Sequence, residues 1–200
     1  MGKTIGTATV TDDGLLFENG DLIVVGKMPD FSKPVAFIDF DGVLNVFPDS
    51  NRENNTEMLT ATHVSLDGLG FGDDGILVRY DERVVKAIRN LNALWCTSWK
   101  AHTQNCLNPA FGIDWGYVDW HYRGLSDPGV YGKIDSLTEV VRETGCDFAC
   151  IDDDFFGCGG MKDVITSNAG KEPLAVIVPD TRIGLQLEDI EKLVSLGFIA

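Results

Sequence analysis

The sequence has no apolar run that approaches the roughly 20 residues of a membrane-spanning helix, so we expect no membrane segment. The opening residues, MGKTIGTATV, lack the apolar core of a secretory signal. They also lack a myristoylation motif, because that motif requires Ser or Thr at the position that Gly6 occupies. These absences favour an intracellular, cytoplasmic protein with no membrane as a partner.

Basic residues are scarce: 16 Lys and Arg stand against 31 Asp and Glu, which gives a net charge of −15. A field of this sign repels the phosphate backbone of DNA and RNA at long range. Stable binding to long nucleic acid is therefore not expected. Small anionic substrates remain compatible with this charge if a cation or a helix N-terminus offsets it locally.

A disulfide framework is not expected, because the chain has five cysteines, an odd number, and no secretory signal. Cys146 and Cys150 are four residues apart, but both fall in an apolar run that reads as a buried strand. We interpret the cysteines as ordinary thiols rather than zinc ligands.

The 200 residues suit one main domain with a small addition. Residues 1–33 contain two short apolar runs divided by Asn19-Gly20, which predicts an N-terminal β-hairpin appendage. Residues 34–200 then form the main domain.

Within the main domain, compact apolar runs alternate with segments of helical periodicity, which predicts an α/β fold with a doubly wound, Rossmann-like parallel sheet. The predicted strands lie at 35–39, 76–80, 93–99, 146–154 and 174–178. The predicted helices lie at 81–91, 133–143 and 187–196.

Polar residues cluster where the predicted strands end. Right-handed crossovers bring these ends to one edge of the sheet, where such folds bind ligands. We therefore expect four groups far apart in the sequence to meet there: Asp39 with Asp41, Thr97 with Ser98, Lys133, and the run Asp152-Asp153-Asp154.

Asp39 and Asp41 stand two apart at a strand end, a spacing that predicts side chains on one side of the strand. Paired carboxylates repel each other unless a cation lies between them. Together with Asp152 and Asp153 they make an all-oxygen set of the kind that Mg²⁺ prefers.

A carboxylate can also attack phosphorus and form an aspartyl-phosphate that water later hydrolyses. That reaction needs an attacking group, a proton shuttle and donors for the phosphate oxygens. Asp39 suits the first role and Asp41 the second. The predicted phosphate-binding residues are Thr97, Ser98, Lys133 and Gly42, the last through backbone amides at a sharp turn.

Four segments in order, DFDGVLN (39–45), LWCTSW (94–99), YGKIDSL (131–137) and CIDDD (150–154), resemble the motifs of the haloacid dehalogenase-like hydrolases, a superfamily mostly of phosphatases. The resemblance implies a Rossmann-like fold and Mg²⁺-dependent phosphoryl transfer. It implies Asp39 as nucleophile and Asp41 as general acid/base. It also implies metal contacts from the Asp39 carboxylate, the Asp41 backbone carbonyl, Asp152 and Asp153.

The segments TSWKAHTQN and VPDTRIGLQLEDIEKLVSLG are similar to those of small phage and actinobacterial members of this superfamily. The chain has no room for a large cap domain. Residues 45–75 are expected to supply a short β-flap, and residues 100–132 a small lid. For a phage-encoded protein, the expected location is the cytoplasm of the host.

The leading hypothesis is a Mg²⁺-dependent phosphatase that acts on a small phosphorylated metabolite, such as a nucleoside monophosphate. Two alternatives stay open: a phosphatase of nucleic-acid ends, and a non-catalytic binding protein that keeps the fold. Phosphomutases use the same residues, and neither the substrate nor the oligomeric state follows from the sequence.

Overall fold

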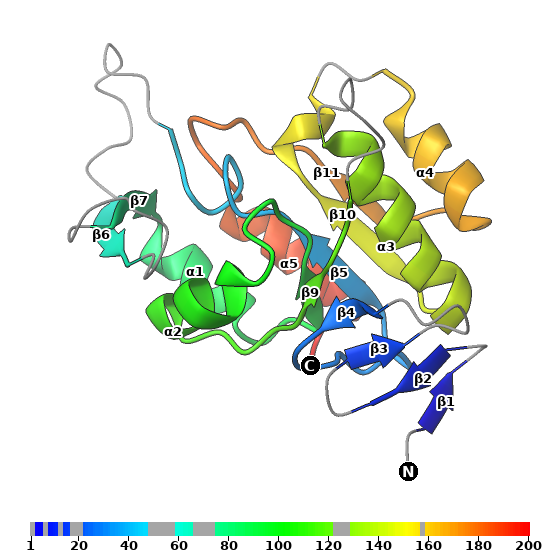
Figure 1. Ribbon diagram of the computed structural model, residues 1–200. Helices are drawn as coiled ribbons and strands as arrows, with labels where there is room; N and C mark the ends of the chain where they lie inside the picture. Colours follow the sequence, from blue (N-terminus) through cyan, green and yellow to red (C-terminus); the bar gives the residue numbers. More distant parts are fainter. Residues whose placement is uncertain are drawn as a thin grey trace.

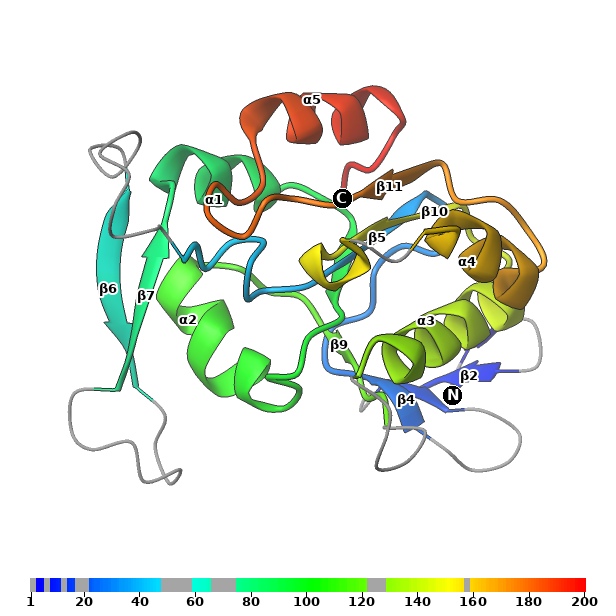
Figure 2. The ribbon, with the colours of Figure 1, turned by 90° about the horizontal axis from the view of Figure 1, so that it is seen from above.

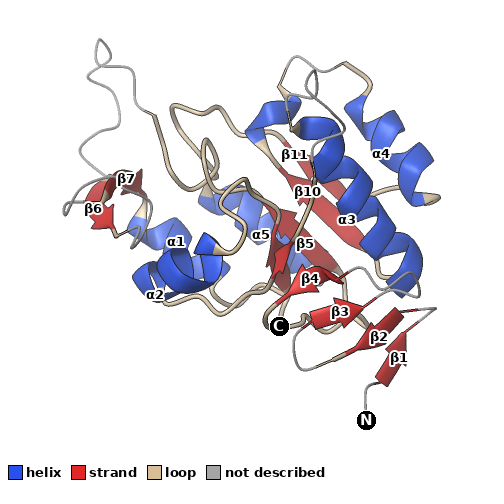
Figure 3. Cartoon of the chain, in the orientation of Figure 1, coloured by secondary structure: helices blue, strands red, loops and turns tan. Residues whose placement is uncertain are grey.

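The computed structural model describes residues 3–5, 8–11, 14–16, 22–47, 59–65, 75–121, 129–156 and 159–200 of the chain. Their centre is a nine-stranded sheet in the order β1-β2-β3-β4-β9-β8-β5-β10-β11 (Figures 1 and 3). The second half of that order is parallel, and its strands are β5 (Val35–Ile38), β8 (Ala93–Trp95), β9 (Tyr117–Val118), β10 (Phe148–Ile151) and β11 (Ala175–Ile177).

The parallel strands confirm the predicted α/β class. Strand β5, the first parallel strand in the chain, lies in the middle. Strands β8 and β9 extend the sheet to one side of it, and strands β10 and β11 extend it to the other. This arrangement is compatible with a Rossmann-like fold, in which ligands bind where the winding reverses, beyond the carboxyl ends of the central strands.

The N-terminal strands belong to the same sheet. They are β1 (Lys3–Ile5), β2 (Ala8–Val10), β3 (Gly14–Leu16) and β4 (Leu22–Val25), each antiparallel to the next, and β4 pairs with β9. The sequence predicts one hairpin over 1–33; the structure has four strands there, and Asn19-Gly20 lies outside the described residues. Pairing with β9 makes this segment an extension of the main sheet.

Helices cover both faces of the sheet (Figure 2). Strand residues alternate between two cores: Ala36 and Ile38 pack with α1 (Glu82–Ile88) and α5 (Leu187–Ser195), whereas Val35 and Phe37 pack with α3 (Val130–Thr144) and α4 (Met161–Ala169). This two-residue alternation is what a strand covered on both faces requires.

Local signals explain the helices that the sequence predicts. The Asp81 side chain accepts a hydrogen bond from the Arg83 amide and caps α1. A reciprocal capping box between Gln186 and Asp189 starts α5. Helix α3 begins at Val130, three residues before the predicted start, and ends where Gly145 adopts a left-handed conformation.

Several elements are missed by the sequence analysis. Helix α4 buries only Met161, Ile165 and Ala169, so its apolar stripe is weak. The predicted lid, 100–132, contains a π-helical turn η2 (Thr103–Leu107), the short helix α2 (Asn108–Phe111) and strand β9. Each is too short to show a periodic pattern.

A separate two-stranded antiparallel sheet stands beside α1 and α2, made of β6 (Thr60–Val64) and β7 (Ile76–Tyr80). Val64 and Val78 are its buried residues, and both belong to the core that contains α1. Of the predicted flap range 45–75, residues 48–58 and 66–74 lie outside the described residues. Among the described helices, none has the length and apolar character to cross a membrane.

Candidate functional site

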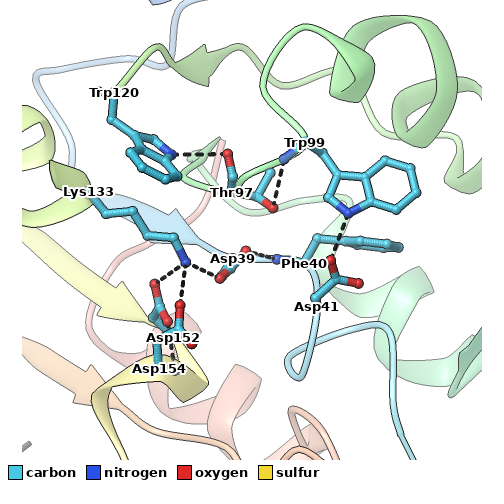
Figure 4. A network of polar contacts seen from close by, with 9 residues as sticks. All are labelled: Asp39, Phe40, Asp41, Thr97, Trp99, Trp120, Lys133, Asp152 and Asp154. Atoms are coloured by element: carbon cyan, nitrogen blue, oxygen red, sulfur yellow. Dashed lines mark hydrogen bonds and ion pairs between the residues drawn. The ribbon is translucent and has the colours of Figure 1, made fainter. Parts of the chain in front are cut away.

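The carboxyl ends of β5, β8 and β10 bring polar residues together at the centre of one sheet edge (Figure 4). Asp39 follows β5, Thr97 follows β8, and Asp152 follows β10, where it caps the 3₁₀ turn η3 (Asp153–Phe155). Lys133 reaches the same place from the first turn of α3. The convergence expected from the sequence is therefore present for these four elements.

Lys133 lies at the centre of the acidic residues. Its ammonium group forms an ion pair with Asp39 and further ion pairs with Asp152 at 3.1 Å and Asp154 at 3.0 Å. Lys133 is only 3% exposed, and Asp39 and Asp152 are 5% and 4% exposed. Burial alone would lower the pKa of Lys133, but the charges of Asp39 and Asp152 raise it well above its usual value, so the lysine stays charged.

Burial is the largest influence on the pKa values of the acidic residues. It raises the pKa of Asp39, although the Lys133 charge and hydrogen bonds from Lys133 and Thr97 act in the opposite direction. Burial and the neighbouring Asp39 raise the pKa of Asp152 well above its usual range. The same two causes raise the pKa of Asp153 to about 6. Each of these carboxyls would be more readily ionised if a further cation were present.

Asp39, Asp152 and Asp153 offer carboxylate oxygens that all lie within 4.8 Å of one another. With Asp154, which pairs with Lys133, four carboxyl groups gather near a single ammonium group, so the acidic groups outnumber the one cation. An all-carboxylate set of this kind suits a hard divalent cation.

Gly42 makes room for this cluster. Its φ is +72°, and a Cβ at this position would lie 2.2–2.5 Å from the carboxyl carbon and oxygens of Asp153. Its amide donates to the Asn45 carbonyl at 2.9 Å, so it is already engaged in the turn. Phosphate binding by backbone amides at this turn stays a prediction, and the absence of a Gly42 side chain leaves space for the Asp153 carboxyl group.

Asp41 lies on the other side of Asp39 and is not one of the three clustered carboxylates. Its Oδ2 accepts from the Trp99 indole at 2.8 Å, and its Oδ1 accepts from the Asn45 amide group at 2.7 Å. The spacing rule for a strand does not apply to it, because β5 ends at Ile38. Beyond it the Phe40 carbonyl accepts amides from Val43, Leu44 and Asn45, which closes a turn.

The two predicted hydroxyl donors differ in placement. Thr97 is 1% exposed, adjoins Asp39, and its Oγ1 accepts from the Trp99 amide at 3.4 Å. Ser98 is exposed on the following turn. Thr97 is therefore the hydroxyl that the structure brings next to Asp39.

Two residues in the site, Asn45 and Trp99, were not identified from the sequence, whereas Asp154 was expected there as part of the run 152–154. Asp154 closes the acidic run CIDDD, and its side chain is 46% exposed, although it reaches Lys133. Asn45 ends the segment DFDGVLN, but only the turn after Phe40 brings it to Asp41. The four tryptophans, Trp95, Trp99, Trp115 and Trp120, are all buried.

A cavity of about 240 Å³ opens at the same sheet edge. Phe156, which follows η3, forms one wall, and residues of the loop after β11 form the other. Those loop residues are Pro179, Asp180, Thr181 and Arg182. At about 240 Å³ the cavity is slightly smaller than a typical small-molecule pocket.

No protein-family model, curated protein or solved structure matches this chain. Any function must therefore be argued from the residues and their geometry.

Proposed function

We propose that the protein is a Mg²⁺-dependent phosphatase of the haloacid dehalogenase-like type, which acts on a small phosphorylated metabolite such as a nucleoside monophosphate. The observation that carries the proposal is the cluster of Asp39, Asp152 and Asp153, of which the first two are buried and paired with Lys133. Buried carboxylates are costly unless they are paired, and here they outnumber their counter-ion.

The donor set fits a magnesium ion. Asp39, Asp152 and Asp153 would hold it, and the family resemblance adds the backbone carbonyl of Asp41. When bound, the ion would neutralise negative charge on the phosphoryl group and align that group with Asp39.

Asp39 is the proposed nucleophile. One of its oxygens forms a bond to phosphorus while the bond from phosphorus to the ester oxygen breaks. Its Oδ1 accepts from the Phe40 amide at 2.6 Å and its Oδ2 pairs with Lys133, so the carboxylate is fixed in orientation before substrate binds. Lys133 and Thr97 adjoin the same carboxylate, and in the proposed reaction both would donate to phosphate oxygens.

Asp41 completes the proton transfers. It gives a proton to the departing ester oxygen and then takes one from the water that attacks the aspartyl-phosphate. That attack releases inorganic phosphate and restores the Asp39 carboxylate, so the cycle balances without a further reactant.

A small substrate agrees with two further observations. The net charge of −15 opposes a long phosphate backbone, whereas a single phosphoryl group meets local positive charge at Lys133. The cavity lined by Phe156 and the 179–182 loop has room for part of a metabolite-sized leaving group.

The test is phosphate release from a panel of phosphorylated metabolites and p-nitrophenyl phosphate, with Mg²⁺ or with EDTA. We expect turnover that requires Mg²⁺ and falls at least about a thousandfold in Asp39→Asn, since the nucleophile is lost. Asp147→Asn is the matched control, because Asp147 lies just before β10 at the opposite edge and pairs with Lys171. Equal rates for Asp39→Asn and the parent would refute the assignment.

The same panel separates the alternatives. A strong preference for an oligonucleotide with a terminal phosphate over the matching mononucleotide would favour a phosphatase of nucleic-acid ends. Mg²⁺ binding without turnover of any phosphoester would favour a binding protein.

A further inference from the structure

Both carboxylate oxygens of Asp41 are held by side chains that carry no charge. The Trp99 indole donates to Oδ2 at 2.8 Å, and the Asn45 side-chain amide donates to Oδ1 at 2.7 Å (Figure 4 shows the Trp99 bond). Two directional bonds, one to each oxygen, fix the plane of the carboxylate as well as its position.

The two donors are themselves fixed. Trp99 is 9% exposed, and its ring packs edge-to-face on Phe40 at 5.1 Å between centroids. Asn45 is 4% exposed, and its Oδ1 accepts from the Arg79 backbone amide at 3.2 Å, so both ends of its amide group are bonded. Neither side chain can turn without losing a buried contact.

These donors also connect Asp41 to two other parts of the molecule. Trp99 lies two residues after Thr97, and its backbone amide contacts the Thr97 hydroxyl. Asn45 contacts strand β7 through Arg79, and the next residue, Val46, donates to the Arg79 carbonyl at 2.7 Å. The position of Asp41 is thus tied to the Thr97 turn and to the β6–β7 sheet.

We propose that Trp99 and Asn45 are positioning residues for the proton transfers of Asp41, and that Asn45 makes the orientation of this carboxylate depend on strand β7. The inference rests on the proposed function, in which Asp41 protonates the leaving group. A general acid acts only within hydrogen-bond reach of the atom that receives the proton. A small change in the orientation of Asp41 therefore lowers the rate of the reaction.

The experiment uses the dependence of kcat/KM on the leaving group. p-Nitrophenolate departs readily without a proton, whereas phenolate departs from phenyl phosphate far better with one. We expect Trp99→Phe to lower kcat/KM for phenyl phosphate at least about tenfold more than for p-nitrophenyl phosphate. Phenylalanine keeps a ring against Phe40 but has no donor for Asp41.

Trp95→Phe is the matched control. Trp95 is 0% exposed, and its indole donates to Asn108 at 2.8 Å, so the change removes a buried bond of the same length that does not involve Asp41. We expect any effect of this change to be equal for the two esters. An equal loss for both esters in Trp99→Phe would overturn the proposal, because that is the result of a merely structural role.

Two further variants sharpen the test. Asn45→Asp keeps an acceptor for the Arg79 amide but removes the donor to Asp41, and we expect the same selective loss with phenyl phosphate. In an Asp41→Asn background, Trp99→Phe should cause no additional selective loss, because there is no acid left to position. An additional loss there, or no selective loss in Asn45→Asp, would contradict the proposed roles.

Failure of the proposed function gives a different result. If the parent protein hydrolyses neither ester nor any metabolite of the panel, the phosphatase assignment fails and this inference fails with it. If the parent hydrolyses both esters and Trp99→Phe shows no selective loss, this inference alone is refuted.

Discussion

Two aspartates of the site, Asp39 and Asp41, have opposite surroundings. On the acidic side, Asp39 lies among Asp152, Asp153 and the ammonium group of Lys133, all close together at the strand ends. On the indole side, Asp41 is only two residues further along, yet it is bonded to the uncharged donors of Trp99 and Asn45.

The difference indicates two tasks. A carboxylate among other carboxylates is held by charge, and its energy depends on any cation that enters. A carboxylate between two neutral donors has a fixed orientation that depends much less on such a cation. The first environment suits a nucleophile and metal ligand, and the second suits a group that must point at one oxygen atom.

Lys133→Met should have the largest effect, because it leaves the acidic side without its counter-ion. Removing one partner of a buried ion pair typically costs about 3–5 kcal/mol of unfolding free energy. Denaturant unfolding of the metal-free protein measures this loss. Lys162→Met is the control: Lys162 pairs with Glu172 on the surface, and its loss should leave the unfolding midpoint nearly unchanged. Similar midpoint shifts for both variants would contradict the account.

Gly42→Ala should come next, since its Cβ would lie 2.2–2.5 Å from the Asp153 carboxyl group. Gly145→Ala is the matched control, because Gly145 has a similar positive φ of +68° but no atom within 4 Å of a Cβ. The control should lose about 1 kcal/mol from backbone strain. Gly42→Ala should lose that amount and also weaken Mg²⁺ binding, as measured by calorimetry. Unaltered Mg²⁺ affinity would show that the space left by Gly42 is not needed for metal binding by Asp153.

Asp152→Asn should weaken Mg²⁺ binding by at least about tenfold, because one charged ligand becomes neutral. Asp154→Asn should have a smaller effect, since Asp154 is not one of the three clustered carboxylates and its side chain is 46% exposed. Isothermal titration of both variants with MgCl₂ makes the comparison. An equal loss of Mg²⁺ affinity in both variants, or a larger loss in Asp154→Asn, would indicate that the ion does not bind at Asp152.

The smallest effect concerns pH. Burial and Asp39 raise the pKa of Asp153 from 3.8 to about 6, so the folded protein binds this proton more tightly than the unfolded chain. The Asp153 contribution to the stability of the metal-free protein should therefore fall as pH rises from 3.8 through about 6. Asp153→Asn should remove part of that fall in a series of unfolding curves. Parallel profiles for parent and variant would contradict the raised pKa.

Much of the acidic side could be predicted from the sequence. Asp39 and Asp152 end apolar strands, and the parallel topology forces such ends onto one edge. Lys133 could also be anticipated, because it stands in the first turn of a helix with clear apolar periodicity.

The indole side could not be predicted, because it depends on a turn. The Phe40 carbonyl accepts three amides, which redirects the chain and takes Asp41 away from Asp39. Nothing in the spacing of Asp39 and Asp41 signals that turn, and Trp99 reads equally well as core. Helix α4 and strand β9 were missed for a similar reason: they are stabilised by packing on the sheet, and their own patterns are weak.

The most direct test of the central claim is to trap the covalent intermediate. The protein would be mixed with Mg²⁺ and an activated aryl phosphate, quenched in acid within one turnover, digested and mapped by mass spectrometry. The account predicts one phosphoryl group on Asp39, absent in Asp39→Asn. A phosphoryl group on Asp41, or full turnover with no phosphoryl group on either residue, would contradict it.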